Sequence, residues 1–180
     1  MSPAAPASFR RTTHFTTLSR QHAQTDVSEQ TISQPTVNLF VYGTLLFDEL
    51  VMALSGKHFA SAAATLHGYS RHAIVRDGKQ EAYPAIQPNP SGIVPGRVLF
   101  NVDEPSMRRI DCFESDPPVY DRTEVQVDLD EGKEISAITY VARPGLTPCL
   151  MEDWNQDHFA RNHLKEYLTT VVPWARRQMG

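Results

Sequence analysis

The sequence predicts an α+β fold in which helices flank a mixed β-sheet that is curved or barrel-like. Several segments alternate or run apolar as strands do, and three separate helical segments occur without a sustained strand–helix–strand alternation. The composition agrees with a globular domain, because 41% of the residues are hydrophobic and 21% are charged. At 180 residues, the chain can form one well-buried core and is short for two full-sized domains.

Residues 1–36 differ from the rest of the chain. They are rich in Ser, Thr, Gln, Ala and Pro and have no sustained apolar period, so we expect a flexible arm before one domain at 37–180. Arg10, Arg11 and Arg20 occur without an acidic residue in the first 25 positions, which is also the composition of a mitochondrial transit peptide. The apolar core of a secretory signal is missing.

Charge and cysteine usage indicate the partners and compartment to expect. The net charge is −4 and the arginine pairs are isolated, so no basic face for a nucleic acid is expected. Cys112 and Cys149 have no paired spacing, which argues against a disulfide scaffold or a zinc ribbon and favours a reducing, cytoplasmic location. The apolar runs are too short to cross a bilayer, so no membrane partner is expected.

The predicted elements begin with a strand over 37–42, VNLFVY, a short apolar run typical of a buried strand. A helix follows at once in TLLFDELVMALSG, where apolar residues recur at helical spacing and Gly56 should end the helix. Residues 63–75 and 96–102 are predicted strands. The proline- and glycine-rich segment between them, 83–96, is predicted to be a stiff loop.

The second half continues the mixture of helices and strands. A short helix is expected over 103–114, with Asp103 as its N-cap. Residues 119–129 and 135–142 alternate and are rich in β-branched side chains, so they predict a hairpin joined by the turn DEGK. Apolar residues then recur at helical intervals in a C-terminal helical extension over 150–180.

The chain turns sharply after the first predicted strand, at Gly43 and Thr44. A helix that begins directly after a strand leaves its first N–H groups without partners inside the helix, and its dipole adds partial positive charge. A carboxylate or phosphate is the natural ligand of such a corner, and Gly43 lets it approach the backbone closely. The alternative is that Gly43 only permits the turn and Thr44 only caps the helix. With one glycine and no lysine, the corner does not predict a nucleotide loop.

Five short motifs occur in the order FVYGTL, YPAI, GRVLFNV, IDCFES and YDRTEV. Together they resemble the gamma-glutamylcyclotransferase-like superfamily, in particular its AIG2-like and gamma-glutamylamine cyclotransferase branch. The resemblance covers most of residues 37–142, and the trailing EDWNQDHFARNHLKEY is similar to the C-terminal extension of plant and fungal AIG2-like proteins. It implies the fold of that superfamily and a substrate loop, formed by Tyr42, Gly43, Thr44 and Leu45, that binds through backbone amides.

Glu114 is a carboxyl residue on the apolar side of its predicted helix. At about 100° per residue it lies about 40° from Ile110, on the same side as Met107. Burial would raise its pKa toward neutrality, as a general acid and base requires. The alternative is a helix-terminal glutamate turned toward solvent. The FES motif matches the proton-transferring glutamate of the superfamily, so the resemblance implies the catalytic role.

The resemblance implies an intramolecular reaction on a small-molecule substrate. In a γ-glutamyl compound, the α-amine attacks the γ-carbonyl, which yields 5-oxoproline and releases the attached amine or amino acid. Because nucleophile and electrophile share one molecule, holding the folded conformer supplies proximity, and neither an enzyme nucleophile nor a cofactor is needed. This agrees with the lack of a convincing Ser-His-Asp or Cys-His pattern. The amides of residues 43–45 would hold the α-carboxylate, and Glu114 would move the protons.

Further residues are supporting candidates. Tyr83 in YPAI and Tyr120 in PPVYDR match aromatic positions near the pocket of the superfamily, and sheet packing is the alternative for both. Arg122 alternates onto the same strand face as Tyr120 and could pair with an acidic group, in a structural or a substrate-facing role. The sequence departs from the family pattern in the Pro-Pro pair between Glu114 and Tyr120, which leaves the choice of substrate open.

Other chemistry-bearing side chains are not assigned to a site. His158 and His163 would diverge by about 140° on a continuous helix and should not share a metal ion, and His67 and His72 fare no better, so no metal site is expected. Cys112 has no histidine nearby in sequence and fits a small packed residue.

Glu81, Asp111 and Asp116 are alternative carboxyls. Asp111 lies about 300° from Glu114 on the helix, so the two could meet. The resemblance carries no role onto Asp111.

The leading hypothesis is a cofactor-independent cyclotransferase for γ-glutamyl amines or peptides. The alternative is a non-catalytic binding module of the same fold, in which the corner binds an acidic metabolite or a carboxylate of a partner. The two differ in whether Glu114 is buried and faces the corner. The amine part of the substrate and the oligomeric state stay open, and loops at 83–96 and 143–153 are expected to line the amine side.

Overall fold

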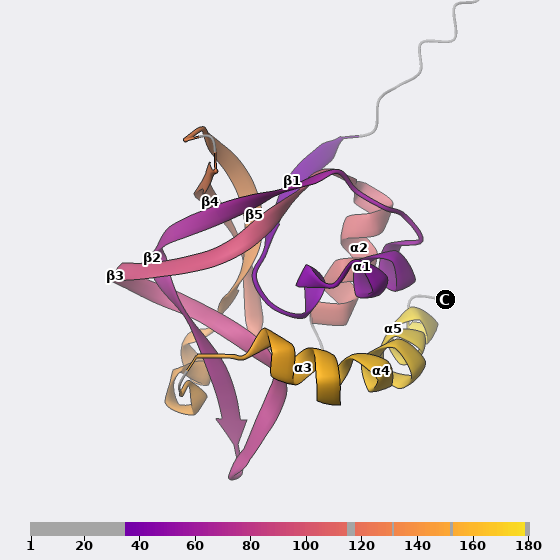
Figure 1. Cartoon of the computed structure of the whole chain (residues 1–180). Coiled ribbons are helices and arrows are strands. Elements are labelled where there is room, and N and C mark those ends of the chain that lie inside the picture. Colours follow the sequence, from indigo (N-terminus) through magenta and orange to yellow (C-terminus); the bar gives the residue numbers. More distant parts are fainter. Residues whose placement is uncertain (1–34, 115–117, 131, 152, 179–180) are drawn as a thin grey trace, which may run out of the picture. The chain divides into compact units, whose positions relative to one another are not determined.

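A computed structural model describes residues 35–114, 118–130, 132–151 and 153–178. Of the predicted arm, residues 1–34 lie outside the described part of the chain, and the first strand begins at Thr36. The described strands form a closed barrel in the order β1–β3–β2–β4–β5 (Figure 1). Their bounds are Thr36–Val41 for β1, Ser61–Arg76 for β2, Lys79–Asp103 for β3, Tyr120–Leu129 for β4 and Glu134–Ala142 for β5.

The sheet is mixed, as the sequence predicted. Strand β1 pairs antiparallel with β3 and parallel with β5. The hairpins β2–β3 and β4–β5 are antiparallel, and β2 meets β4 at Ala64 and Thr65, opposite Leu129 and Asp128. The predicted α+β class with a barrel-like sheet and flanking helices is therefore confirmed, as is the predicted hairpin of β4 and β5.

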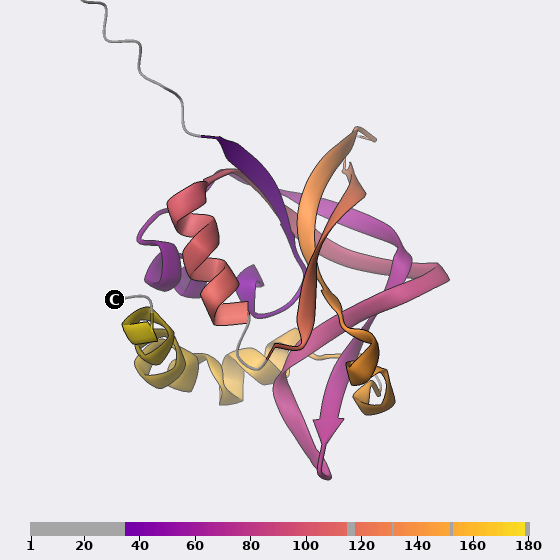
Figure 2. The same cartoon turned by 180° about the vertical axis from the view of Figure 1, so that it is seen from behind.

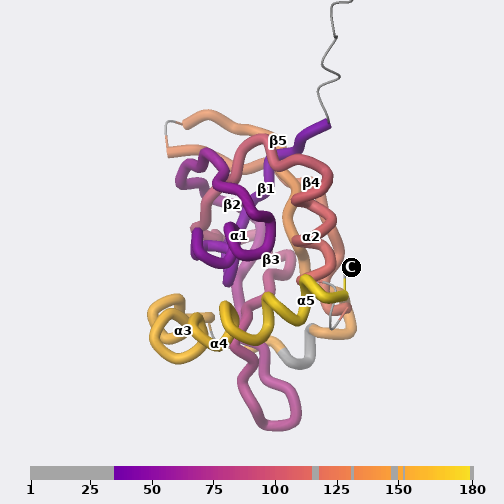
Figure 3. The backbone as a smooth tube through the Cα atoms, turned by 90° about the vertical axis from the view of Figure 1, so that its right-hand side faces the viewer, coloured from indigo at the N-terminus to yellow at the C-terminus, as the bar shows by residue number. Residues whose placement is uncertain are grey.

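The loop predicted over 83–96 is wrong. These residues belong to β3, and the hairpin that β3 forms with β2 projects beyond the barrel (Figure 3). Prolines are tolerated there because β1 pairs only with the C-terminal part of β3, from Arg97 to Asp103, so that residues 79–96 have a strand partner on one edge alone. The proline and glycine content of this segment favours a loop locally, but the long pairing with β2 overrides this preference.

The first helix begins later than predicted. Thr44–Leu46 form a 3₁₀ turn, η1, and α1 spans Asp48–Ser55, because Phe47 between them has an extended backbone (φ −90°, ψ 117°). Gly56 ends α1 as expected, with φ 75° and its N–H donating to the Met52 carbonyl at 2.8 Å.

Helix α2, Glu104–Glu114, matches the predicted helix closely. The Asp103 side chain accepts a hydrogen bond from the Ser106 N–H at 3.0 Å, so the predicted N-cap is confirmed. Met107 and Ile110 are buried in the core between the barrel and the helices. Glu114 is the last residue of α2, and its backbone position is therefore set by this packing.

The C-terminal segment is a chain of short helices. A 3₁₀ segment, η2, spans Pro144–Cys149, and the helices are α3, Gln156–Asn162; α4, Leu164–Glu166; a π-helical turn η3, Tyr167–Val171; and α5, Val172–Gln178. Figure 2 shows α5 beside α2, and η3 and α5 both contact α1. No helix in the described part of the chain is long and apolar enough to cross a membrane.

Strand β1 is covered on both sides. Leu39 and Val41 lie in the core that β1 shares with the helices, whereas Phe40 and Tyr42 lie in the core inside the barrel. This explains the apolar run LFVY at residues 39–42. It also brings the C-terminal end of β1 to the boundary between the two cores.

Candidate active site

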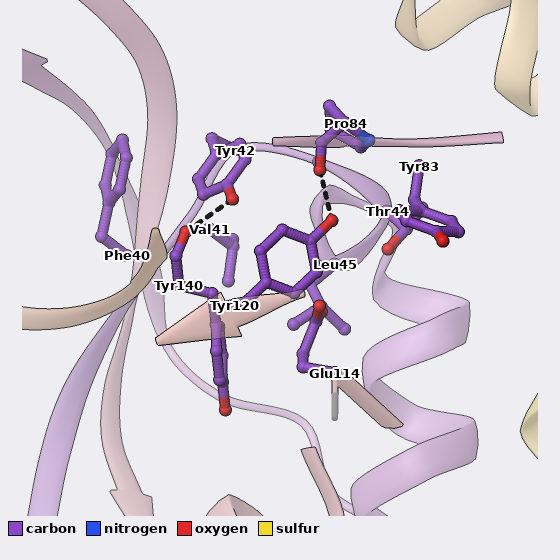
Figure 4. Close-up of a pocket in the computed structure, with 11 residues that line it drawn as sticks. Phe40, Val41, Tyr42, Thr44, Leu45, Tyr83, Pro84, Glu114, Tyr120 and Tyr140 are labelled. Atoms are coloured by element: carbon purple, nitrogen blue, oxygen red, sulfur yellow. Dashed lines mark hydrogen bonds between the residues drawn. The ribbon is translucent and has the colours of Figure 1, made fainter. Parts of the chain in front are cut away.

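A cavity of about 320 Å³ opens at the end of β1 (Figure 4). The end of β1, the 3₁₀ turn, β3, the last turn of α2 and strands β4 and β5 all contribute to its wall. All the site residues predicted from the sequence line it. The complete lining is Phe40, Val41, Tyr42, Gly43, Thr44, Leu45, Tyr83, Pro84, Glu114, Tyr120 and Tyr140.

The corner amides at Gly43, Thr44 and Leu45 donate no hydrogen bond to any described residue outside the strand pairing. Each of these N–H groups belongs to a peptide unit whose carbonyl oxygen already accepts a hydrogen bond. The Gly43 carbonyl accepts from Leu46 N–H at 2.9 Å and the Thr44 carbonyl accepts from Phe47 N–H at 3.2 Å. Because a trans peptide points its N–H opposite to its C=O, these bonds orient the unused donors.

Two arginines with largely buried side chains, one on β2 and one on β3, also bind carbonyls of the corner. Arg71 of β2 donates to the Tyr42 carbonyl at 3.0 Å and pairs with Asp153 at 2.9 Å. Arg97 of β3 donates to the Leu45 carbonyl at 3.3 Å. The carbonyls at both ends of the corner are thus held by side chains, which leaves its amides as the available polar groups.

Close packing also determines the shape of the corner. A Cβ added at Gly43 would lie 2.6 Å from Cγ of Pro84, far inside van der Waals contact. The adjacent Thr44 and Leu45 are buried. The approach of the Pro84 ring therefore requires a glycine at this position, and the access of a ligand to the backbone stays a prediction.

Glu114 reaches the same cavity from the end of α2, and Figure 4 shows its carboxyl directed toward Leu45 and Tyr120. The side chain is half-buried, and its carboxylate forms no hydrogen bond or ion pair with any described residue. Burial, with a smaller contribution from the negative charge of Asp111, raises the pKa of Glu114 from 4.5 to about 8. The residue therefore exchanges protons readily near neutral pH.

Tyrosines surround the carboxyl. The Tyr42 hydroxyl donates to the Tyr140 carbonyl at 2.6 Å, and the Tyr120 hydroxyl donates to the Pro84 carbonyl at 2.5 Å (Figure 4). The rings of Tyr83 and Tyr120 meet edge to face with centroids 6.4 Å apart. Burial raises the pKa of all four hydroxyls, so these groups stay neutral and polar without adding charge to the cavity.

The alternative carboxyls have other partners or lie outside this cavity. Asp111 accepts from the Tyr140 hydroxyl at 2.7 Å and pairs with Arg122 at 3.0 Å, which confirms the predicted acidic partner of Arg122. Glu81 pairs with Arg76 at 3.3 Å. Asp116 lies outside the described residues.

The predicted divergence of His158 and His163 is wrong. Their rings lie 5.6 Å apart, because the helix ends at Asn162 and His163 leaves the helical conformation with φ −127°. The described residues contain no group of three or more His, Cys, Asp or Glu arranged to hold a metal ion.

Similarity to known proteins agrees with this architecture. The family model of gamma-glutamyl cyclotransferase, AIG2-like, matches residues 39–156. The chain belongs to the AIG2-like gamma-glutamyl cyclotransferase family. The family indicated by the five sequence motifs is thereby confirmed.

Members of this family from Arabidopsis thaliana align along most of the chain. AIG2-like protein D is 32% identical over 140 residues, covering 77% of this chain and 88% of that protein. The solution structure of an Arabidopsis thaliana protein has a TM-score of 0.59 at 25% identity and covers 77% of this chain and 89% of that one. A gamma-glutamyl cyclotransferase of known structure has a TM-score of 0.53 at 22% identity, with coverage of 61% and 68%, and shares the fold.

Sequence reasoning missed several residues that shape the site in this family member. Arg71 and Arg97 act on backbone carbonyls that a sequence does not reveal, and Pro84 acts by packing on a glycine 41 positions earlier. Tyr140 lies on a strand predicted correctly, and its place in the hairpin register, opposite Arg122, could have indicated a position near Tyr120. The signal for the arginines was weaker, namely a basic residue inside a predicted strand.

Proposed function

We propose that this protein is a cofactor-independent cyclotransferase that converts γ-glutamyl amines or peptides to 5-oxoproline and the released amine. One observation carries this proposal. Unused backbone amides at Gly43–Leu45 and a carboxyl with raised pKa, Glu114, face a single small cavity. The cavity thus offers a corner that could bind a carboxylate and a group that could transfer protons. The family to which the chain belongs supports the assignment of these roles.

The corner would bind the α-carboxylate of the γ-glutamyl group. Amide N–H groups are strong donors to an anion, and they gain strength where neighbouring tyrosines and apolar residues exclude water. Binding at one end would fold the flexible γ-glutamyl chain so that its α-amine approaches its own γ-carbonyl. Orienting two groups of one molecule supplies much of the rate enhancement without an enzyme nucleophile.

Glu114 would carry the protons. As a carboxylate it accepts a proton from the α-amine while the nitrogen forms a bond to the γ-carbon. It then donates this proton to the nitrogen of the leaving amine as the original amide bond breaks. Both protonation states must be accessible for this sequence, and a pKa of about 8 makes them so near neutral pH.

The test is direct detection of 5-oxoproline. The full chain would be incubated with γ-glutamyl-ε-lysine, γ-glutamyl-alanine, glutathione and γ-glutamyl-benzylamide, and products would be separated by liquid chromatography and identified by mass spectrometry. We expect enzyme-dependent 5-oxoproline from at least one of them. Absence of product from all four would contradict the proposal.

The second candidate is a binding module that uses the same corner without catalysis. The amide-lined corner favours it as much as it favours an enzyme, because both need a grip on a carboxylate. Isothermal titration with glutamate and 5-oxoproline, run beside the product assay, separates the two. Binding without any turnover would select the module.

A further inference from the structure

A second cavity adjoins the first and shares Glu114 with it. Its volume is about 400 Å³, and it shares Thr44, Tyr83, Glu114 and Tyr120 with the first cavity. The rest of its wall consists of Phe113, Val119, Tyr167 and Val171. Glu114 therefore stands where the two cavities meet, and a molecule that fills both would pass its middle beside the carboxyl.

The two cavities differ in their chemistry. The first contains the unused amides of the corner, which suit a carboxylate. The second contains no Lys, Arg or His among its described lining residues, and Glu114 is its single carboxyl there. An anion placed in the second cavity would lose its hydration without gaining a cationic partner, whereas an apolar group would gain from burial.

The C-terminal segment builds the distinctive part of this wall. Tyr167 packs edge to face on Phe159 with ring centroids 4.9 Å apart and on Phe113 at 6.3 Å. Val171 ends the same π-helical turn and is half-buried. The sequence prediction assigned the amine side to loops at 83–96 and 143–153; of these two segments only 83–96 contributes a described lining residue, Tyr83, and η3 and the end of α2 add Tyr167, Val171 and Phe113.

On the basis of the proposed function, we propose that the second cavity holds the amine part of the substrate and selects γ-glutamyl amides of uncharged apolar or aromatic amines. The α-carboxylate would lie at the corner, and the amide bond to be broken would lie beside Glu114. The amine would then contact Phe113, Tyr167 and Val171. γ-Glutamyl amino acids would be poorer substrates, because their second carboxylate would enter a cavity without a matching cation.

A comparison of three substrates tests this preference. We would measure kcat/KM from 5-oxoproline release for γ-glutamyl-benzylamide, γ-glutamyl-alanine and γ-glutamyl-(4-aminobutyl)amide, whose amine parts are apolar, anionic and cationic. We expect the benzylamide to exceed the alanine substrate by about 10-fold or more. It should also exceed the cationic substrate, because a buried ammonium group would have Glu114 as its single described carboxyl partner, and the proposed reaction itself uses this carboxyl. Equal values, or a preference for either charged amine part, would overturn the inference.

A charge placed in the wall should reverse the preference. Val171→Lys is expected to lower kcat/KM for the benzylamide by about 10-fold and to raise the alanine-to-benzylamide ratio by more than that. Thr170→Lys adds the same charge to the neighbouring, exposed position of the same turn and should leave the ratio unchanged. Val171→Ser, which adds no charge, should lower the benzylamide value alone and serves if the lysine variant does not fold by circular dichroism.

The outcomes distinguish a failure of the proposed function from a failure of the role given to the second cavity. No 5-oxoproline from any substrate would contradict the proposed function itself. Turnover of all three substrates with Val171→Lys affecting them equally would contradict only the role of the second cavity.

Discussion

The corner after β1 and the last turn of α2 face the same cavity with different parts of the chain. The corner contributes backbone N–H groups. Peptide geometry, hydrogen bonds from two arginines and the close approach of Pro84 together determine the direction of these groups. The end of α2 contributes one side chain, Glu114, whose chemistry follows from burial and a neighbouring charge. Packing thus determines the first group and electrostatics the second. Substitutions at the two places should consequently change different kinetic constants.

The largest effect is expected from Glu114→Gln. This change keeps the shape of the side chain and removes its proton transfer, so kcat should fall by roughly 100- to 10,000-fold with little change in KM. The measurement is steady-state 5-oxoproline release at saturating and limiting substrate. Glu104→Gln, on an exposed glutamate of the same helix that pairs with Arg108, is the matched control and should be neutral. Activity like that of the wild type in Glu114→Gln would remove the carboxyl from the mechanism.

Gly43→Ala should have the next largest effect, on binding. The new Cβ would contact the Pro84 ring and displace the corner amides, so we expect kcat/KM to fall by roughly 10- to 100-fold, mainly through KM. Pro84→Ala in the same chain removes the contacting atoms and should restore part of the loss. Gly145→Ala, where an added Cβ meets no atom within 4 Å, is the control. If Gly43→Ala changed kcat alone, the assignment of substrate binding to the corner and of proton transfer to Glu114 would be wrong.

Asp111→Asn tests how much the charge of Asp111 contributes to the raised pKa of Glu114. The negative charge of Asp111 raises the pKa of Glu114, so its removal should lower that pKa from about 8. The rise of kcat/KM with pH that reports Glu114 ionisation should then move to lower pH, and the rate near pH 7 should change by less than about 10-fold. A pH profile between 5 and 9 measures this. An unchanged midpoint would mean that burial alone sets the pKa.

The smallest effect concerns stability. The folded-state pKa of Glu114 is raised to about 8 from 4.5, so its contribution is most favourable below about pH 4.5 and is lost as the pH rises to about 8. Glu114→Gln has no ionisable group at this position, so it does not lose stability for this reason as the pH rises. Its free energy of unfolding relative to the wild type should therefore increase across this window by on the order of 2 kcal/mol, less than the roughly 5 kcal/mol of the full pKa shift, because the half-buried carboxyl is partly screened by solvent. Urea unfolding at pH 5 and pH 8.5 measures the difference, and parallel behaviour of the two proteins would contradict it.

Local patterns predicted much of the fold. The buried strand at the start of the domain, the helix capped by Asp103 and the β4–β5 hairpin follow from periodicity and end signals within about a dozen residues each. The prediction failed at 83–96 and at His163, where a long strand partner and a break in the helix changed the local outcome. Such competition between local preference and long-range pairing is not visible in one segment.

The sequence by itself determined which groups the site would contain: a glycine corner after a buried strand, a carboxyl on the apolar side of a helix, and tyrosines at two strand positions. Tertiary structure alone decided what these groups can do. The direction of the amides depends on Arg71 and Arg97, and the pKa of Glu114 depends on the side chains that bury it. Hydrogen-bond direction and desolvation arise between segments far apart in the chain, so they exist only once the barrel and the helices have come together.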